Sequence, residues 1–211
     1  MRSPLIIGHR GFASRFPDNS LAGVAAAIEA GADGVEVDIR PCADGTWVCH
    51  HDRSRDGRPV REWGMEALSR EGVPTLAKVA ATLPPECLLF VEVKPLPERD
   101  LLAGLGALVA LLRPRASSAR VISSSEPVLA AVRGALPGVA LSLVFDKIPE
   151  RLPEGIELSP FHRLVEALLS TGRPLHPWTV NQPERMRELA RLGVASVTTN
   201  DPSLAVEVLR G

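Results

Sequence analysis

Eight short apolar segments, each typical of a buried β-strand, recur along the chain and alternate with segments of helical periodicity. The strand-like segments are residues 4–9, 34–52, 88–94, 119–125, 139–145, 155–160, 174–180 and 194–199. The clearest helix follows Asp18-Asn19-Ser20, which supplies N-cap residues; apolar residues then repeat with helical spacing until Gly31. Further helices are predicted over 101–112, 127–136, 162–170, 183–192 and 203–210. Strands alternating with helices predict a parallel sheet, and eight strands predict an α/β fold, a (β/α)8 TIM barrel forming one domain over residues 1–211.

Residues 34–52 count as one strand of the barrel because their two halves are too close together to be parallel. Only residues 40–45 separate "GVEVDI" from "TWVCHH", which is too short for a parallel crossover. Asp44-Gly45 favours a tight turn, so a β-hairpin is predicted to extend the second strand. With these two as the only turn residues, Asp38 lies opposite His51, and alternation places Glu36 and Asp38 on one face.

Composition excludes several classes of protein. The formal charge is −1 with no long run of like charges, which argues against a nucleic-acid partner. The three cysteines lack metal-site spacing, and no apolar run reaches the length of a membrane span. Because a strand-like segment begins at residue 4, we expect no signal peptide. We therefore expect a cytoplasmic protein with a small-molecule substrate; its oligomeric state is not predicted.

Ionisable residues gather at the predicted carboxyl ends of the strands, where barrel enzymes place their active sites. Three carboxylates at that rim predict one hard divalent cation, Mg²⁺ or Ca²⁺ with Mn²⁺ as an alternative; these are Glu36, Asp38 and Glu92. Two basic residues, Arg10 and Lys94, are suited to a phosphate. Two histidines, His9 and His51, can act as an acid–base pair. Together they predict metal-assisted phosphoester cleavage.

Each residue taken alone also has a structural explanation. His9 could simply form a hydrogen bond at a strand end, and Glu92 with Lys94 could be an ion pair at the rim. Trp178 could serve packing alone. Three further histidines are interpreted as structural, since one points to the other face of the hairpin and two have no supporting partners: His50, His162 and His176. The convergence of the set favours a functional site.

A series of short motifs resembles the glycerophosphodiester phosphodiesterases nearly from end to end. They occur in the order "HRG", "PDNS", "GADGVEVDI", "DGTWVCHHD", "VPTL", "VEVK", "WTVN" and "TNDP". The resemblance implies a (β/α)8 barrel and metal-dependent hydrolysis of glycerophosphodiesters to sn-glycerol 3-phosphate and an alcohol. It leaves open whether the glycerol 2-hydroxyl attacks first, giving a cyclic phosphate, or water attacks directly.

The resemblance also implies roles for individual residues. His9 and His51 correspond to the acid–base pair, and the metal carboxylates correspond to Glu36, Asp38 and Glu92. Arg10 and Lys94 would hold the phosphate, and Trp178 would line the glycerol side.

The chain departs from the family pattern at four places. Asp18 replaces a glutamate, Ser125 replaces an aromatic residue, and Asn200 replaces an aspartate. The insertion after the His-Asp motif is reduced to residues 53–72, which implies a more open pocket. Two alternatives follow: a lysophospholipase D-like phosphodiesterase, and a non-catalytic barrel that binds a phosphorylated polyol.

Overall fold

The computed structural model describes residues 3–211, so the first two residues of the predicted domain lie outside it. Its main sheet has the order β10-β1-β2-β6-β7-β8-β9, with β3 paired to β2. These strands are β1 (Leu5–Gly8), β2 (Gly34–Pro41), β3 (Trp47–Cys49), β6 (Leu88–Val93), β7 (Ala119–Ser123), β8 (Ala140–Phe145), β9 (Glu157–Pro160) and β10 (Ser196–Thr199). All neighbouring pairs are parallel except β2 with β3.

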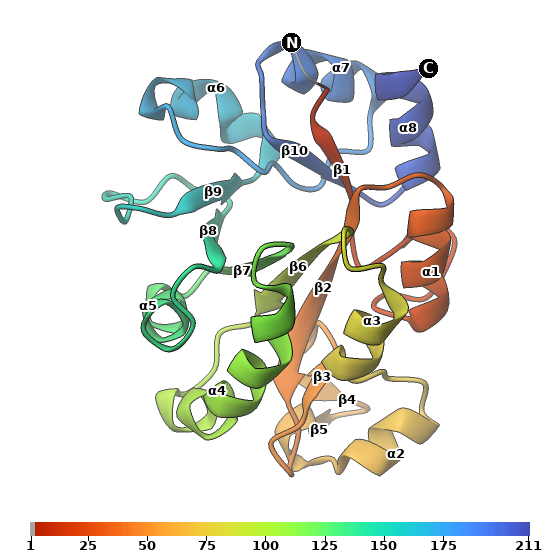
Figure 1. Cartoon of the computed structure of the whole chain (residues 1–211), viewed down its shortest axis with the longest axis vertical. Helices are drawn as coiled ribbons and strands as arrows, with labels where there is room; N and C mark the ends of the chain where they lie inside the picture. Colours follow the sequence, from red (N-terminus) through yellow and green to blue (C-terminus); the bar gives the residue numbers. More distant parts are fainter. Residues whose placement is uncertain (1–2) are drawn as a thin grey trace.

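Helices surround this curled sheet, as Figure 1 shows. They are α1 (Leu21–Glu29), α2 (Met65–Arg70), α3 (Leu76–Thr82), α4 (Glu98–Leu112), α5 (Glu126–Ala135), α6 (Val165–Leu168), α7 (Pro183–Arg191) and α8 (Pro202–Arg210). Ser20 caps α1 by accepting a hydrogen bond from the amide of Gly23, as the sequence predicts. The predicted barrel is confirmed, with two local differences.

The first difference is the predicted seventh strand, residues 174–180, which is not a regular strand. It makes only isolated bridges at Leu175 and Trp178. Its backbone still bonds to both neighbours: the amide of His176 donates to Leu158, and that of Val180 donates to Thr198. Pro174 and Pro177 carry no amide hydrogen, so a continuous ladder cannot form there. The segment nonetheless closes the ring between β9 and β10.

The second difference concerns the helical layer. The predicted helix at 162–170 forms as α6 between the short 3₁₀ turns His162–Leu164 and Leu169–Thr171. Residues 146–156, between β8 and β9, contain no helix, in keeping with the absence of a helical pattern there. No helix among residues 3–211 is long and apolar enough to cross a membrane.

Alternation along β2 and β6 divides the side chains between the helical layer and the barrel interior. Val35, Val37 and Ile39 are fully buried against the surrounding helices. Glu36 and Asp38, between them, point the other way and are also buried. This period of two places charged groups inside the barrel with no break in the apolar outer face.

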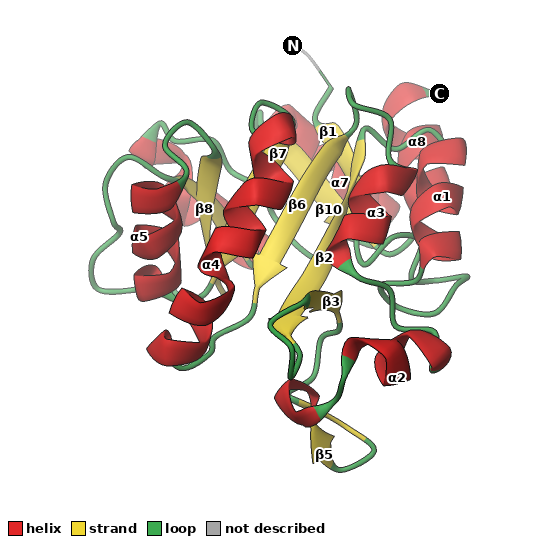
Figure 2. Ribbon diagram, turned by 60° about the horizontal axis from the view of Figure 1, so that its bottom comes forward, coloured by secondary structure: helices red, strands yellow, loops and turns green. Residues whose placement is uncertain are grey.

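The insertion stands at the end of the barrel toward which β2 and β6 point, as Figure 2 shows. It contains the small hairpin β4 (Ser54–Arg55) and β5 (Arg58–Pro59), a 3₁₀ turn at Val60–Glu62 and α2. A separate small core holds it to the β2–β3 hairpin, formed by Cys42, Val48, Val60, Leu68 and Val73.

Candidate active site

The predicted site residues meet in one cavity of about 130 Å³ at the carboxyl ends of the strands. Seven of the eight line it: His9, Arg10, Glu36, His51, Glu92, Lys94 and Trp178. Asp38 lies behind them, in contact with Lys94 and Arg10. Apolar side chains, among them Phe90 and Val144, form much of the remaining wall.

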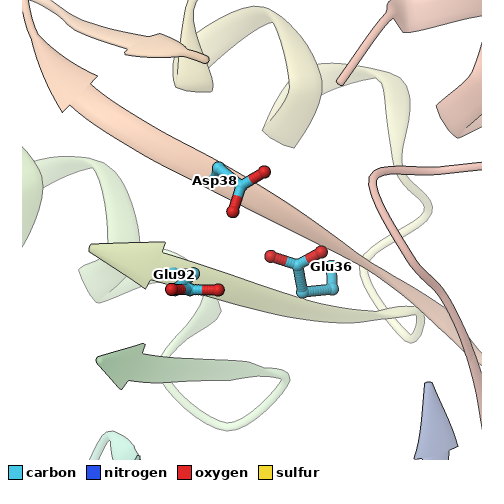
Figure 3. Close-up of side chains that lie close together, drawn as sticks. All are labelled: Glu36, Asp38 and Glu92. Atoms are coloured by element: carbon cyan, nitrogen blue, oxygen red, sulfur yellow. The ribbon is translucent and has the colours of Figure 1, made fainter. Parts of the chain in front are cut away.

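The three carboxylates lie on two neighbouring strands and turn toward one another, as Figure 3 shows. Asp38 on β2 is directly opposite Glu92 on β6. Glu36 is two residues before Asp38 on β2, so its side chain lies on the same face of the strand. One oxygen from each lies within 4.8 Å of the others. Asp38 and Glu36 are 0% and 3% exposed. Parallel pairing and alternation together therefore produce the cluster.

Two cations partly neutralise this cluster. The ammonium of Lys94 lies between the carboxylates of Asp38 and Glu92, at 2.7 and 2.6 Å. The guanidinium of Arg10 lies 3.0 Å from Asp38 and 2.5 Å from Asp18. The shortened acidic side chain of Asp18 therefore still reaches Arg10.

Burial and mutual repulsion separate the pKa values of the carboxyl groups. Burial, with the charges of Asp38 and Glu92, holds the pKa of Glu36 well above its ordinary value. Burial likewise raises the pKa of Glu92. Burial also acts to raise the pKa of Asp38, but Lys94 and Arg10 outweigh it and lower that pKa. Of the three carboxyl groups, Asp38 is therefore the one whose charged form the two cations stabilise most.

The cluster fits a divalent cation. Oε1 of Glu36 is buried and has no hydrogen-bond partner among the described residues. A buried carboxylate oxygen without a partner is unfavourable, and a hard cation that prefers oxygen ligands would supply one. Glu36, Asp38 and Glu92 are the residues that could hold it.

His9 is held by a residue at the opposite end of the sequence. Its Nδ1 lies 2.6 Å from Oδ1 of Asn200, and its Nε2 lies 4.0 Å from Glu36. Because an amide oxygen only accepts, Nδ1 carries the proton and Nε2 presents its lone pair to the cavity. Burial lowers the pKa of His9, which favours the neutral ring.

His51 lines the cavity, but the β2–β3 hairpin that carries it has a different pairing register from the predicted one. The pairing of Ile39 with Cys49 places Asp38 opposite His50, so the predicted pairing of Asp38 with His51 is wrong by one residue. The amide of Cys42 bonds to Thr46, leaving a turn of three residues, in which Gly45 has φ +79°. Since β3 ends at Cys49, strand alternation no longer applies at His51.

The ring of His51 is 43% exposed, and its Nδ1 lies 2.8 Å from Oδ1 of Asp52. The neighbouring carboxylate orients the ring so that Nε2 is the free nitrogen. His50 lies away from the cavity, with Nε2 3.4 Å from the carbonyl of Ser54. The two adjacent histidines therefore have different surroundings.

Asn19 supports the site although it was not among the predicted site residues. Its side chain accepts from the amide of Asp38 and donates to the Asp38 carboxylate, at 2.9 and 3.0 Å. It has φ +59° and is 2% exposed. The "PDNS" motif contains the signal for this residue. From the sequence alone, the motif is assigned a family carboxylate, Asp18, and a helix cap, but Asn19 is assigned no site role.

Close backbone packing positions the His-Arg-Gly loop. Gly11 has φ +86°, and a Cβ there would stand 2.6 Å from the carbonyl carbon of Gly23 in α1. Only glycine fits this contact. Arg10, with φ +51°, donates its amide to Glu36 at 3.1 Å. The loop thus fixes His9 and Arg10 against both α1 and the acidic cluster.

Trp178 also lies on the wall of the cavity. Its indole Nε1 donates to the carbonyl of Ser159 at 2.8 Å, and its ring meets Phe161 edge to face. One face therefore lines the cavity from a fixed position.

Comparisons with known proteins point to one family. The model of the glycerophosphoryl diester phosphodiesterase family matches residues 9–111 and 119–204. A glycerophosphodiester phosphodiesterase of Caldanaerobacter subterraneus subsp. tengcongensis is 28% identical over 240 residues, covering 98% of each chain.

Two solved structures share the fold. A glycerophosphodiester phosphodiesterase from Thermotoga maritima has a TM-score of 0.83 at 22% identity, covering 99% of each chain. An Oleispira antarctica phosphodiesterase, solved in complex with the product sn-glycerol-3-phosphate, has a TM-score of 0.86 at 20% identity. It covers 99% of this chain and 98% of its own.

Proposed function

Because the chain belongs to the glycerophosphoryl diester phosphodiesterase family, we propose that it hydrolyses glycerophosphodiesters to sn-glycerol 3-phosphate and an alcohol, using one divalent cation. The observation that carries the proposal is the acidic cluster of Glu36, Asp38 and Glu92, two of which line one cavity together with His9. The family match, and the product bound to the Oleispira antarctica relative, support the substrate class.

Glu36, Asp38 and Glu92 would hold the cation, which when bound supplies positive charge to the phosphoryl oxygens. Arg10 and Lys94 border the same cavity and would hold the phosphate. To do so, Lys94 would exchange part of its present contact with Asp38 and Glu92 for the substrate. Trp178 would line the glycerol side.

The two histidines have surroundings suited to opposite proton transfers. His9, neutral and with a free Nε2 lone pair, would take the proton from the attacking hydroxyl. His51, oriented by Asp52, would give a proton to the leaving alcohol oxygen. Asn200, in place of the family's aspartate, supports this assignment because it fixes the proton on Nδ1 of His9.

Release of glycerol 3-phosphate from glycerophosphocholine and glycerophosphoethanolamine tests the proposal, with EDTA, Mg²⁺, Ca²⁺ and Mn²⁺ in parallel. We expect metal-dependent release that Glu36→Gln abolishes. Glu98→Gln is the matched control, since Glu98 is exposed on the first turn of α4. Equal release in EDTA would contradict the metal role. Lack of release from folded protein with every metal would contradict the activity and leave the lysophospholipase D-like and binding-barrel alternatives, which lysophospholipid substrates then distinguish.

A further inference from the structure

A second, larger cavity lies beside the first. It has a volume of about 530 Å³ and is bounded by the insertion on one side and the loop after β6 on the other. Its apolar walls include Val60 and Leu96. Three arginines also border it: Arg40, Arg53 and Arg61.

Three stretches of chain contribute residues both to this groove and to the proposed active site. Arg40 is two residues beyond Asp38 on β2, and its Nε donates to the carbonyl of His51 at 3.0 Å. Arg53 is two residues beyond His51, and Pro95 in the groove wall follows Lys94 directly. His51 therefore stands on the boundary between the two cavities.

The groove carries unbalanced positive charge. Among residues 3–211, no carboxylate lies within 4.0 Å of the guanidinium of Arg40 or Arg53, whereas Arg61 has Asp100 at 4.0 Å. Arg40 and Arg53 both border the groove, so it brings two such guanidinium groups together. Asp52, which precedes Arg53, has its carboxylate 2.8 Å from Nδ1 of His51. Two neighbouring arginines without acidic partners favour an anionic ligand.

We propose that this groove binds the leaving alcohol of the substrate, and that Arg40 and Arg53 select alcohols bearing an anionic group such as a second phosphodiester. This rests on the proposed function, in which His51 protonates the leaving oxygen and the alcohol must therefore lie beside His51. The cavity of about 130 Å³ around His9 holds little more than the glycerol phosphate portion. The alcohol must extend outward, and the groove begins at that point.

The test compares three substrates whose alcohols differ in charge: glycerophosphocholine, glycerophosphoglycerol and bis(glycerophospho)glycerol. We expect kcat/KM to be highest for the anionic alcohol and to fall as NaCl is raised. Arg53→Gln should lower kcat/KM about 3–10-fold for the anionic substrate and leave the choline substrate unchanged or faster. Arg40→Gln should likewise lower the ratio of kcat/KM for the anionic substrate to that for the choline substrate. This ratio is informative because loss of the Arg40 bond to His51 would affect all substrates alike.

Arg191→Gln, which removes one exposed charge at the end of α7 far along the chain, is the matched control. Equal kcat/KM for the three substrates, or a ratio unchanged in both Arg53→Gln and Arg40→Gln, would overturn the selectivity while leaving the phosphodiesterase activity intact. Hydrolysis of none of the three would overturn the proposed function, and the groove assignment with it.

Discussion

Asn19 illustrates how one uncharged residue can hold a charged site in place. It forms two hydrogen bonds with Asp38 from a left-handed backbone conformation, φ +59°. Asn19→Ala should lower the free energy of unfolding by about 2–4 kcal/mol, because it loses a bond to a charged acceptor and strains the backbone. Asn19→Gly, which loses the bonds without the strain, should cost about 1–2 kcal/mol less. Urea unfolding measures both, and equal costs would show that the backbone conformation contributes nothing.

His51 and His50 offer a comparison between adjacent residues of one type. His51→Ala should slow turnover by about 10²–10⁴-fold, the usual effect of a positioned acid or base. Its 43% exposure implies that stability changes by less than about 0.5 kcal/mol. His50→Ala, on the other side of the chain, should leave turnover unchanged. Initial-rate assays with both variants test this, and loss of activity in His50→Ala alone would reverse the assignment.

The sequence predicted which side chains come together at the cavity better than it predicted the contacts between them. Alternation of Val35, Glu36, Val37, Asp38 and Ile39 encodes which side chains enter the barrel, because a strand has only two faces. Contacts between distant segments were not accessible in this way. Asn200 meets His9 from the far end of the chain, and no local pattern predicts which of its neighbours it contacts.

At the scale of elements, the hairpin shows why its register could not be counted from the turn alone. Asp44 accepts hydrogen bonds from the amides of Thr46 and Met65, so its position depends on the insertion as well as the turn. These bonds lower the pKa of Asp44 to about 2. The sequence indicated that a turn occurs here, but one of the contacts of the turn comes from 21 positions away and is not visible in the local pattern.

The irregular segment 174–180 is held by side chains where its backbone cannot form a ladder. His176 bonds Ser196 on β10 at 2.8 Å and Glu157 on β9 at 3.0 Å, and Glu157 also pairs with Arg120 on β7. Burial acts to raise the pKa of Glu157, but the bonds from His176 and Arg120 outweigh it and lower the pKa to about 2. This network therefore links three strands to the segment that closes the barrel.

The network gives a prediction with a defined pH dependence. A carboxyl group whose pKa falls on folding stabilises the protein above its ordinary pKa of 4.5 and loses that contribution as the pH drops toward 2. Glu157→Gln should therefore lower the free energy of unfolding on the order of 1–3 kcal/mol at pH 7, and by less at pH 3. Urea unfolding from pH 3 to 7 measures the difference. Glu154→Gln, in an exposed loop, is the control; a deficit independent of pH would contradict the charge-based account.

At the scale of the whole molecule, burying three neighbouring carboxyl groups lowers the stability of the fold, and a bound cation would offset this effect. Glu36 lies buried at the centre of the fold, its pKa raised by burial and by its acidic neighbours. Ion binding requires Glu36 to release its proton, so metal affinity, protonation and folding are linked. A ligand present at 100 times its Kd stabilises the folded state by about 2.7 kcal/mol.

Metal should therefore stabilise the wild type but not a variant that lacks the Glu36 carboxylate. Saturating Mg²⁺, Ca²⁺ or Mn²⁺ should raise the Tm of the wild type by about 5–10 °C, the shift that about 2.7 kcal/mol produces in a domain of this size. Glu36→Gln should lose this shift, while its stability in EDTA should equal or exceed that of the wild type, since a buried acid becomes a neutral amide. Differential scanning calorimetry with and without metal measures both. An equal metal-dependent shift in the two proteins would place the cation elsewhere, and a large loss of stability in EDTA would mean that Glu36 stabilises the barrel without it.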